Sequence, residues 1–572
     1  MRRDEDSGTP SDAGAHGDVD AHPGTGVPQG PGAHPRPGVR RGAVARRWAR
    51  RAVWPAALAL ALTAGALGLG SPAGADPAPG GLPGAVDEIL ADPRMDGGGA
   101  SVVIADAATG ETLYAHRPDE RLMPASNTKL ATSAAAMELL GPGYTFRTDV
   151  LSTGVRRGSV LVGDLYLRGT GDPTALAADY DRLAAEVAAA GIKRVTGRLV
   201  ADDTRFDAQR LGRSWAGDDE SSYYSAQISA LTVAPDTDYD AGTVIVEAVP
   251  GAAAGDRPKV TITPPTSYVR VENRGTTVPA GQRDTLSVER RHGTNTIVVS
   301  GQIPLGAAAT KEWVTVWEPT GYAAAVFRDA LRGHGVRIGG PDLLGRAVPE
   351  GARQLAVHRS MPLGELLVPF MKLSNNMHAE ALTKAMGYET AGSGSWGAGL
   401  DAIEGYLAKA GVDAGTIRQV DGSGLSRMDN FPADQLVKLL LAVRDAPWYR
   451  DWHAALPVAC APGRFEGGTL RSRMCGTPAA LNARAKTGSL TGASALSGYV
   501  KDADGRELVY GIVLNNYLAS SVKPLEDAIV VTLARSRKGG AEAEVETVRP
   551  TGARSGEAPT DLECSWIKPR VC

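Results

Sequence analysis

Ser126 and Lys129 are three residues apart at the start of residues 126–140, where Ala, Leu and Met recur at helical spacing. Residues with this separation share one face of a helix, so the two side chains could contact each other. A serine hydroxyl needs an adjacent base to act as a nucleophile, and a lysine can be that base when its surroundings lower its pKa. Backbone N–H groups at the helix N-terminus would point toward Ser126, where an oxyanion would form. Taken alone, the pair is better explained as a capped helix with a solvent-facing lysine.

A second polar motif, Ser-Asn-Asn at residues 374–376, lies where a helical segment begins or breaks. Ser374 could relay a proton, and Asn376 could hydrogen-bond a substrate amide. Asn375 occupies the middle of the motif. Because polar turns are common, this motif alone is weak evidence for a site.

A third motif, Lys486-Thr487-Gly488, is followed by Ser489 inside a predicted strand. Thr487 and Lys486 could bind a carboxylate, and Gly488 would let a substrate backbone approach the strand edge. An ordinary hairpin turn is the simpler explanation of this motif alone, but three such motifs in this order are much harder to dismiss together. The same series, with Asp in the middle of the second motif, occurs in β-lactamases and penicillin-binding proteins.

With these motifs, the chain resembles the low-molecular-weight class C penicillin-binding proteins, the type 4 D-alanyl-D-alanine carboxypeptidase/endopeptidase family (serine peptidase family S13). Ser126 and Ser374 are 248 residues apart, and this long interval is similar to the one that holds two nested domains in that family. The resemblance covers the chain from about Leu82 to Leu533. Further family-like stretches lie at 163–166, 168–174, 199–206, 215–224, 229–233 and 421–426.

The resemblance implies an α/β (α+β) penicillin-binding, β-lactamase-like transpeptidase domain, with an antiparallel sheet flanked by helices and large β-rich nested insert domains. The pattern of helices and strands predicted along the chain agrees with this architecture. Mixed strand and helix patterns at both ends surround short β-type runs from about Phe146 to Val357. We therefore expect a discontinuous catalytic domain at 78–145 and 364–540, a β-rich insert domain at 146–171 and 256–363, and a nested insert domain at 172–255.

The resemblance also implies a role for each motif residue. Ser126 would be acylated by the penultimate D-Ala carbonyl of a peptidoglycan stem peptide, and Lys129 would take its proton. Ser374 would pass a proton to the leaving D-Ala amine, with electrostatic support from Lys486. The other contacts would come from Asn376 to the substrate backbone, from Thr487 and Ser489 to the terminal carboxylate, and from the N–H groups of Ser126 and Ser489 to the oxyanion. Water would deacylate the enzyme, whereas a β-lactam would leave a slow acyl-enzyme.

A cluster of aromatic and acidic residues in the insert could select the substrate. Its members are Trp215, Asp218, Asp219 and Tyr223. Such a cluster suits an ammonium group, while Arg427, close to Leu425 in the same candidate substrate site, could bind a carboxylate through two hydrogen bonds. Together they suggest recognition of a zwitterionic side-chain end, such as that of a diaminopimelate-type residue. A solvated loop with a packed tryptophan explains the same residues equally well.

The N-terminal region carries an export pattern. Residues 1–39 are rich in Gly, Pro, Asp and His, and six arginines follow within 40–51, so we expect 1–51 to be a disordered basic leader. An uncharged apolar run at 52–70 then precedes an Ala-Gly-Ala site. Residues 52–75 therefore favour a cleaved signal peptide, with a membrane anchor as the alternative because 19 residues could just span a bilayer. We expect an exported protein, either secreted or associated with the cell envelope.

If the protein is exported, its four cysteines are expected to form disulfides. Cys460 and Cys475 are 15 residues apart, and Cys564 and Cys572 are eight apart. In an oxidising compartment, two local disulfides are the simplest of the three possible pairings. The second disulfide would pin a C-terminal tail at 541–572. A metal site is disfavoured because no Cys-x-x-Cys motif occurs.

The net charge limits the kinds of partner that the protein is expected to bind. A net charge of −3 argues against a nucleic-acid partner. The expected partners are a peptidoglycan stem peptide and β-lactams, with membrane contact only through the signal peptide or anchor, and no cofactor or metal is expected. Two alternatives stay open. A β-lactamase-like hydrolase is disfavoured by the large insert, and a non-catalytic peptidoglycan- or β-lactam-binding protein is disfavoured by the intact Ser126–Lys129 pair.

Overall fold

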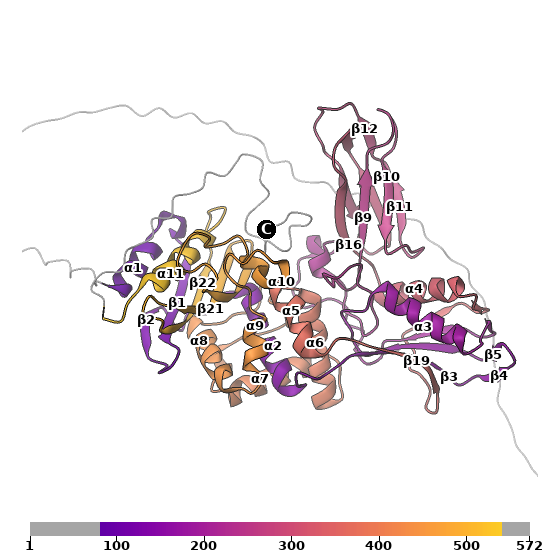
Figure 1. The fold of residues 1–572 in the computed structure, drawn as a ribbon, viewed down its shortest axis with the longest axis horizontal. Coiled ribbons are helices and arrows are strands. Elements are labelled where there is room, and N and C mark those ends of the chain that lie inside the picture. The colour runs from indigo at the N-terminus through magenta and orange to yellow at the C-terminus, as the bar shows by residue number, and fades with distance from the viewer. Residues whose placement is uncertain (1–80, 540–572) are drawn as a thin grey trace, which may run out of the picture. The chain divides into compact units, whose positions relative to one another are not determined.

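The computed structural model describes residues 81–539 (Figure 1). The predicted leader at 1–51, the signal peptide or anchor at 52–75, and the tail at 541–572 with Cys564 and Cys572 lie outside the described residues. Within residues 81–539, no helix combines the length and the apolar character that a membrane span requires.

A five-stranded antiparallel sheet joins the two ends of the described chain. β1 (Gly99–Asp106) pairs along its whole length with β22 (Glu507–Asn515), so an early and a late segment lie side by side (Figure 1, indigo and yellow). The strand order is β2-β1-β22-β21-β20, completed by β2 (Thr112–His116), β21 (Ala493–Lys501) and β20 (Arg484–Leu490). Every residue of β1 is buried, which requires that both faces of the sheet be covered.

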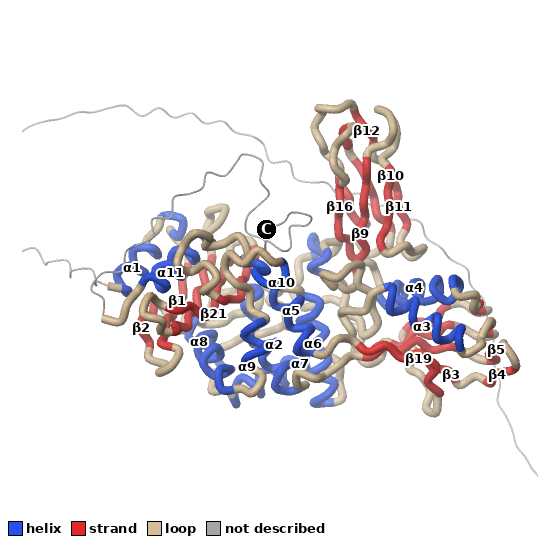
Figure 2. The backbone as a smooth tube through the Cα atoms, in the orientation of Figure 1, coloured by secondary structure: helices blue, strands red, loops and turns tan. Residues whose placement is uncertain are grey.

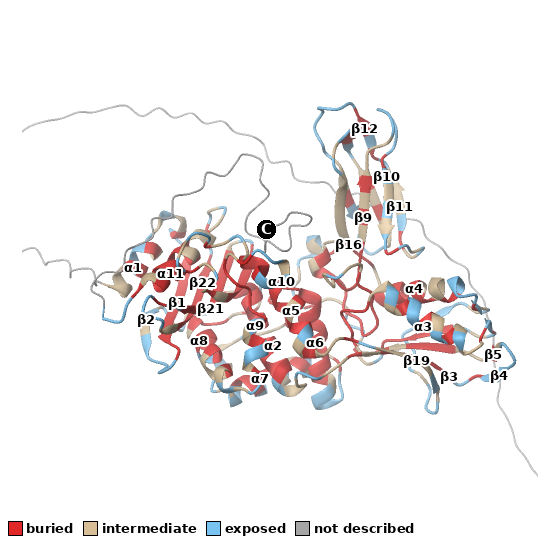
Figure 3. Cartoon of the chain, viewed as in Figure 1, coloured by how far each residue is buried: buried red, intermediate tan, exposed pale blue. Residues whose placement is uncertain are grey.

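Helices cover both faces of this sheet. Val103 and Ala105 of β1 belong to a core shared with α2 and α8, whereas Val102 and Ile104 point the other way, into a core shared with α1 and α11. These helices are α1 (Leu82–Leu90), α2 (Thr128–Leu139), α8 (Ala433–Ala442) and α11 (Lys523–Arg535). Figure 3 shows buried residues along the sheet and along α5 (Leu363–Lys372) and α6 (Asn376–Ala391). The predicted antiparallel sheet flanked by helices is confirmed.

Helix α2 is enclosed by other helices. Ten of its 12 residues are buried, including polar ones, so it has no solvent-facing side for most of its length. Its alanines let α5 (Leu363–Lys372), α6 (Asn376–Ala391) and α7 (Trp396–Lys409) pack closely around it. The N-terminal turn of α2 is therefore held inside the protein.

The helical segment predicted around the second motif forms α5 and α6, which are separated at residues 373–375. Ser374 has a left-handed φ of 58°, which an α-helix cannot accommodate. Asn375 is extended, and its side chain accepts a hydrogen bond from the backbone N–H of His378, so it caps α6. The second motif thus lies at the helix break that its position predicted.

The β-type runs between residues 147 and 359 form several smaller sheets (Figure 2). Their orders are β18-β8-β6-β3-β19, β17-β7-β5-β4, β10-β9-β16, β11-β14-β13 and β12-β15. The strands are β3 (Arg147–Ser152), β4 (Val155–Arg157), β5 (Val160–Val162), β6 (Leu165–Gly169), β7 (Arg194–Val195), β8 (Leu199–Asp202), β9 (Thr243–Val249), β10 (Lys259–Thr263), β11 (Arg270–Asn273), β12 (Thr276–Val278), β13 (Ser287–Arg290), β14 (Thr296–Ser300), β15 (Gln302–Pro304), β16 (Thr310–Thr315), β17 (Arg337–Ile338), β18 (Asp342–Leu344) and β19 (Arg353–Arg359). The remaining helices are α3 (Ala177–Ala189), α4 (Pro319–Gly333), α9 (Tyr449–Ala454) and α10 (Arg464–Gly467). Strand pairing crosses residues 172 and 256, and the division into domains stays a prediction.

Close packing of α6 against α7 depends on Gly399. A Cβ atom at this position would lie 2.0 Å from the carbonyl oxygen of Thr383. We expect Gly399→Ala to lower the free energy of unfolding by about 1–3 kcal/mol, because the helices must move apart. A Cβ at Gly405, also in α7, would meet no atom of another segment of residues 81–539 within 4 Å, so Gly405→Ala should instead stabilise by about 0.5–1 kcal/mol. Denaturant unfolding measures both changes in the free energy of unfolding. Equal stabilities of the two variants would contradict the expected difference between them.

Candidate active site

Ser126 lies in η2 (Ala125–Asn127), a single 3₁₀ turn that leads directly into α2. Lys129, in the first turn of α2, donates a hydrogen bond of 2.8 Å from Nζ to Ser126 Oγ. Ser126 is 1% exposed and Lys129 is 0% exposed. The structure therefore brings together the two side chains whose spacing predicted a contact, and it places them in the interior.

Two other segments hold the Lys129 amine. Its Nζ also donates to Asn376 Oδ1 at 2.6 Å and to the backbone oxygen of Ser423 at 2.8 Å. A buried amine requires such acceptors, because burying a polar group without hydrogen bonds is costly. Since Asn376 is the first residue of α6, this amine fixes the start of α2 against the second motif.

The second and third motifs meet through another serine–lysine pair. Lys486 of β20 donates from Nζ to Ser374 Oγ at 2.8 Å and to the backbone oxygen of Thr487 at 2.9 Å. Lys486 and Ser374 are both fully buried. The side-chain amide of Asn376 also donates to the backbone oxygen of Tyr224 at 2.8 Å. All three motifs thus converge on one buried polar centre.

Strand β20 passes very close to the turn that carries Ser126. A Cβ atom on Gly488 would lie 2.5 Å from the carbonyl oxygen of Pro124. Glycine at this position lets the strand approach the backbone of the protein itself, a reason that the sequence did not reveal. Thr487 donates from Oγ1 to Thr469 Oγ1 at 2.8 Å. Ser489 is 1% exposed, and its Oγ has no hydrogen-bond partner within the described chain.

The loop at residues 421–426 supports the Ser126 turn from another side. Gly424 has a φ of +79°, and a Cβ atom there would lie 1.9 Å from the carbonyl oxygen of Ala125, so only glycine fits. Asp421 shapes the loop by accepting hydrogen bonds of 2.7 Å from the backbone N–H groups of Gly424 and Ser426. This turn places the Ser423 carbonyl at the Lys129 amine. The stretch was recognised as family-like, but no role for Asp421 or Ser423 was predicted.

Three buried carboxyl groups lie behind this loop. Burial, followed by the charge of Asp421, raises the pKa of Glu380 to about 7. The same two causes raise the pKa of Asp429 well above its usual range. Glu380 accepts hydrogen bonds from Trp396 Nε1 at 2.7 Å and from the Gly422 N–H at 2.8 Å. The loop is therefore fixed through a carboxyl cluster whose protonation depends on pH.

Residues 207–224, here termed the cover segment, extend from the β-rich insert to the motif residues. Trp215 Nε1 donates to Asp421 Oδ2 at 2.9 Å, and the Tyr224 carbonyl accepts from Asn376. Tyr223 is 8% exposed and belongs to an apolar cluster with Ala125, Leu425, Leu490 and Ala493. The cover segment thus packs against the turn that carries Ser126 and against the second motif.

The predicted aromatic and acidic cluster is only partly assembled. Trp215 packs edge-on against Trp396, and Tyr223 is enclosed in the apolar cluster. Asp219 instead accepts a hydrogen bond of 2.8 Å from the hydroxyl of Tyr224. Tyr224 was not among the predicted members of the cluster. Asp218 is exposed.

Arg427 is exposed and donates to the backbone oxygen of Thr491 at 2.9 Å. Burial raises the pKa of Asp219, and the charge of Arg427 opposes that rise. The acid and the guanidinium are therefore close enough to interact, as a site for a zwitterion would require.

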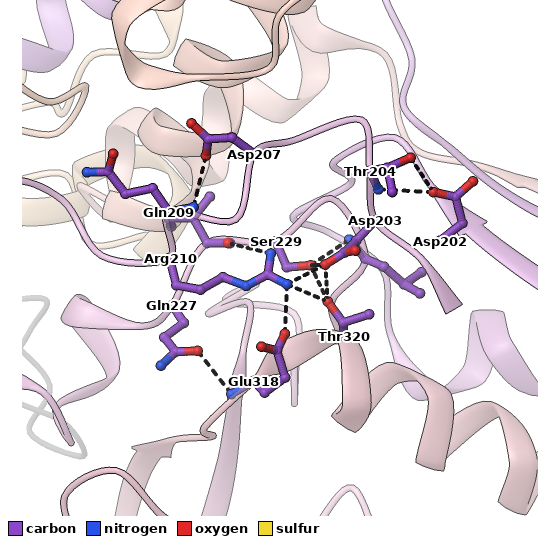
Figure 4. Close-up of polar contacts among 12 residues, drawn as sticks. Asp202, Asp203, Thr204, Asp207, Gln209, Arg210, Gln227, Ser229, Glu318 and Thr320 are labelled. Carbon is purple, nitrogen blue, oxygen red and sulfur yellow. Dashed lines mark hydrogen bonds and ion pairs between the residues drawn. The ribbon is translucent and has the colours of Figure 1, made fainter. Parts of the chain in front are cut away.

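Arg210 anchors the beginning of the cover segment (Figure 4). Its guanidinium donates hydrogen bonds to three side chains from other stretches, namely Asp203, Glu318 and Thr320. Lys384 of α6 holds the same region by donating to Asp207 Oδ1 at 2.6 Å and to the backbone oxygen of Gln209 at 2.7 Å. Charge-assisted hydrogen bonds of this kind are among the stronger ones, so the segment has a firm attachment.

The predicted disulfide between Cys460 and Cys475 is present. It closes a loop that contains Thr469, the hydrogen-bond partner of Thr487. Lys372 supports the same loop by donating to the backbone oxygen of Glu466 at 2.8 Å. The loop therefore packs against the strand that carries the third motif.

A helix-flanked antiparallel sheet with a serine–lysine pair at the start of a buried helix is the arrangement expected of the penicillin-binding and β-lactamase-like class. Within that class, residues 82–536 match the D-Ala-D-Ala carboxypeptidase 3 (S13) family. The chain belongs to this family of serine D-Ala-D-Ala carboxypeptidases, which confirms the family that the motifs indicated.

Known relatives support the assignment. The D-alanyl-D-alanine carboxypeptidase of Actinomadura sp. (strain R39) is 46% identical over 492 residues, covering 84% of this chain and 89% of that protein. The D-alanyl-D-alanine carboxypeptidase DacB of Haemophilus influenzae is 27% identical over 407 residues, covering 69% of this chain and 81% of that protein. The crystal structure of penicillin binding protein 4 (DacB) from Haemophilus influenzae superimposes with a TM-score of 0.67 at 25% identity, covering 77% of this chain and 94% of that chain.

The raised pKa of Glu380 predicts a pH-dependent stability. The folded protein holds a proton on Glu380 up to about pH 7, whereas an unfolded glutamate loses it near its ordinary value of 4.5. The folded state therefore binds more protons in this window, and stability must fall as pH rises through it. We expect the free energy of unfolding to fall between pH 5 and 8 by up to about 3 kcal/mol more in the wild type than in Glu380→Gln.

Denaturant unfolding at several pH values tests this difference. Glu404→Gln changes an exposed glutamate of α7 and is the matched control, so it should keep the wild-type pH slope. Identical slopes in the wild type and in Glu380→Gln would show that Glu380 does not hold the extra proton.

Proposed function

We propose that the protein is an exported D-alanyl-D-alanine carboxypeptidase/endopeptidase that cleaves peptidoglycan stem peptides through an acyl-enzyme on Ser126. The observation that carries this proposal is the hydrogen bond of 2.8 Å between Lys129 Nζ and Ser126 Oγ, with the Ser374–Lys486 pair beside the same centre. Family membership supports the reaction class.

Acylation begins when Lys129 takes the proton of Ser126 as Oγ attacks the carbonyl carbon of the penultimate D-Ala. A lysine acts as a base only in its neutral form, and burial disfavours the charged form. In the neutral form the Lys129 amine donates its two hydrogens to Asn376 Oδ1 and to the Ser423 carbonyl, and its lone pair accepts the hydrogen of the Ser126 hydroxyl across the same 2.8 Å contact. The negative charge on the carbonyl oxygen is stabilised by the backbone N–H groups of Ser126 and Ser489. One such donor is typically worth about 3–4 kcal/mol of barrier.

Collapse of the tetrahedral intermediate needs a proton for the departing D-Ala amine. Ser374 delivers this proton, and Lys486, which donates to its hydroxyl, supplies positive charge and a source of protons for Ser374. Water then attacks the ester on Ser126 and releases the shortened stem peptide. In this step the same groups transfer protons in the reverse direction, and Ser126 regains its free hydroxyl.

Substrate contacts come from the strand edge and from the second motif. Thr487 and Ser489 bind the terminal carboxylate, and the unpartnered Oγ of Ser489 supports this assignment. Asn376 binds the substrate backbone through its side-chain amide. The exposed Arg427 and the neighbouring Asp218 and Asp219 bind a zwitterionic side-chain end of the stem peptide, with Tyr224 orienting Asp219.

β-Lactams acylate Ser126 and inhibit the protein. The name of the structural relative from Haemophilus influenzae, penicillin binding protein 4, supports this assignment. Export through the predicted signal peptide would place the enzyme beside its peptidoglycan substrate, and the disulfide suits an oxidising compartment.

Mass spectrometry after treatment with penicillin tests the nucleophile. The wild type should gain one penicillin adduct on the peptide that contains Ser126, and it should release D-Ala from a peptide ending in D-Ala-D-Ala. Ser126→Ala should lose the adduct and nearly all release, while Ser393→Ala, at an exposed serine, should retain both. An adduct on another residue would overturn the proposal, and rapid penicillin turnover without D-Ala release would indicate a β-lactamase-like hydrolase.

The proposed zwitterion site predicts a selective loss in Arg427→Ala. The KM for stem peptides with a free carboxylate on the side-chain end should rise by about tenfold to a hundredfold, because a charge-assisted hydrogen bond is lost. Peptides with that carboxylate amidated should be cleaved as by the wild type. Arg213→Ala removes another exposed arginine, in the cover segment itself, and should leave the KM for both kinds of peptide unchanged. Equal losses on both peptides would count against the site.

A further inference from the structure

Asn375 stands where the general form of the second motif has aspartate. Asn375 is 5% exposed, and its side chain makes two kinds of contact. Oδ1 accepts a hydrogen bond of 3.3 Å from the backbone N–H of His378 and so caps α6. Nδ2 points to a different part of the chain, residues 236–240, here termed the aspartate loop.

Every partner of the Asn375 Nδ2 in the aspartate loop is an acceptor. Nδ2 donates to the backbone oxygens of Asp238 at 3.3 Å and Tyr239 at 3.1 Å, and to Asp240 Oδ1 at 3.2 Å. An aspartate at position 375 would place an oxygen among these oxygens, opposite the Asp240 carboxylate. Two carboxylates at this distance in a buried site repel each other strongly. The amide of Asn375 therefore matches the acceptors of the loop that it contacts.

The aspartate loop is held firmly on its other sides. Asp238 forms two hydrogen bonds with Arg464, at 3.0 and 2.5 Å, and Asp236 accepts a hydrogen bond of 3.3 Å from Trp313 Nε1. The Tyr239 carbonyl lies 3.0 Å from His378 Nε2. Oxygens of the three aspartates lie within 4.8 Å of one another, but these contacts with an arginine, an indole and an amide already engage them. The cluster serves as an anchor for Asn375.

The neighbours of Asn375 are the two residues of the motif that face the reacting centre. Ser374 has a left-handed φ of 58° and accepts from Lys486, and Asn376 accepts from Lys129. A non-glycine residue keeps such a backbone conformation only where its surroundings enforce it. The side chain between them is fixed at both of its ends, to α6 and to the aspartate loop. Movement of Asn375 would therefore displace Ser374 and Asn376 together.

We propose that Asn375 is a positioning residue that sets Ser374 and Asn376 through its amide contact with the aspartate loop, and that Asp240 dictates asparagine at this position. The inference rests on the proposed function, since it concerns the proton delivery assigned to Ser374. It predicts that residues 375 and 240 are coupled, so that the carboxylate of one requires the amide of the other.

A double-mutant cycle tests the coupling in the full-length protein. Asn375→Asp should lower kcat for D-Ala release and the rate of acylation by penicillin by about tenfold to a hundredfold, with little change in KM, because small displacements of reacting groups have effects of this size. Asn375→Ala should have a smaller effect, since it removes the contact without adding a charge. The double variant Asn375→Asp with Asp240→Asn, which exchanges the two groups, should recover most of the lost kcat.

The outcomes separate the inference from the function on which it rests. If Asn375→Asp turns over substrate like the wild type, or if Asp240→Asn gives no recovery, the inference is overturned while the proposed function stands. If the wild type itself neither releases D-Ala nor gains penicillin on Ser126, the proposed function fails. A poorly folded Asn375→Asp variant, recognised by its melting temperature, leaves the double variant as the deciding measurement: full activity supports the coupling, and inactivity in a folded protein overturns it.

Discussion

The need to satisfy one buried amine is the constraint on which the site depends. Lys129 has no access to solvent, and its amine obtains acceptors from Ser126, Asn376 and the backbone of Ser423. These acceptors belong to the start of α2, to the start of α6 and to the loop at 421–426. Because an unsatisfied amine in the interior would be costly, the three segments can pack only where their oxygens meet it. The geometry of the nucleophile is thus a consequence of packing.

The second requirement is that other backbone segments approach the turn around Ser126 closely, which glycine permits. Gly488 and Gly424 approach the turn around Ser126 from two sides, at distances where any side chain would collide with a carbonyl oxygen. Tyr223 of the insert packs in one apolar cluster with Ala125 of the same turn, and Lys129, in the first turn of the helix that follows, is fully buried. Excluding water strengthens every hydrogen bond within the site. Asp421 links these effects, since it shapes the 421–426 loop and also accepts from Trp215 of the cover segment.

Local patterns predicted the parts of the site that depend on neighbours in sequence. The Ser126–Lys129 contact follows from helical spacing, and the helix break at Ser374 follows from its polar neighbours. The motif order and the family resemblance, and not periodicity, indicated that Lys486 belongs to the same site. The Ser423 carbonyl could not be predicted, because a backbone acceptor has no residue-type signature. Tyr224 escaped prediction for a related reason, since only tertiary packing decides which of two adjacent tyrosines faces an acid.

The small sheets of the insert show the same limit, because alternation identifies strands but not their partners. Their position nevertheless has a mechanistic meaning. Two adjacent residues of the second motif contact different stretches of the insert, Asn375 through the aspartate loop and Asn376 through the Tyr224 carbonyl. The second motif is therefore held from both sides by the insert, while its serine faces the third motif. An insert so attached forms part of the framework of the active site, and changes within it must affect the chemistry even where they touch no reacting group.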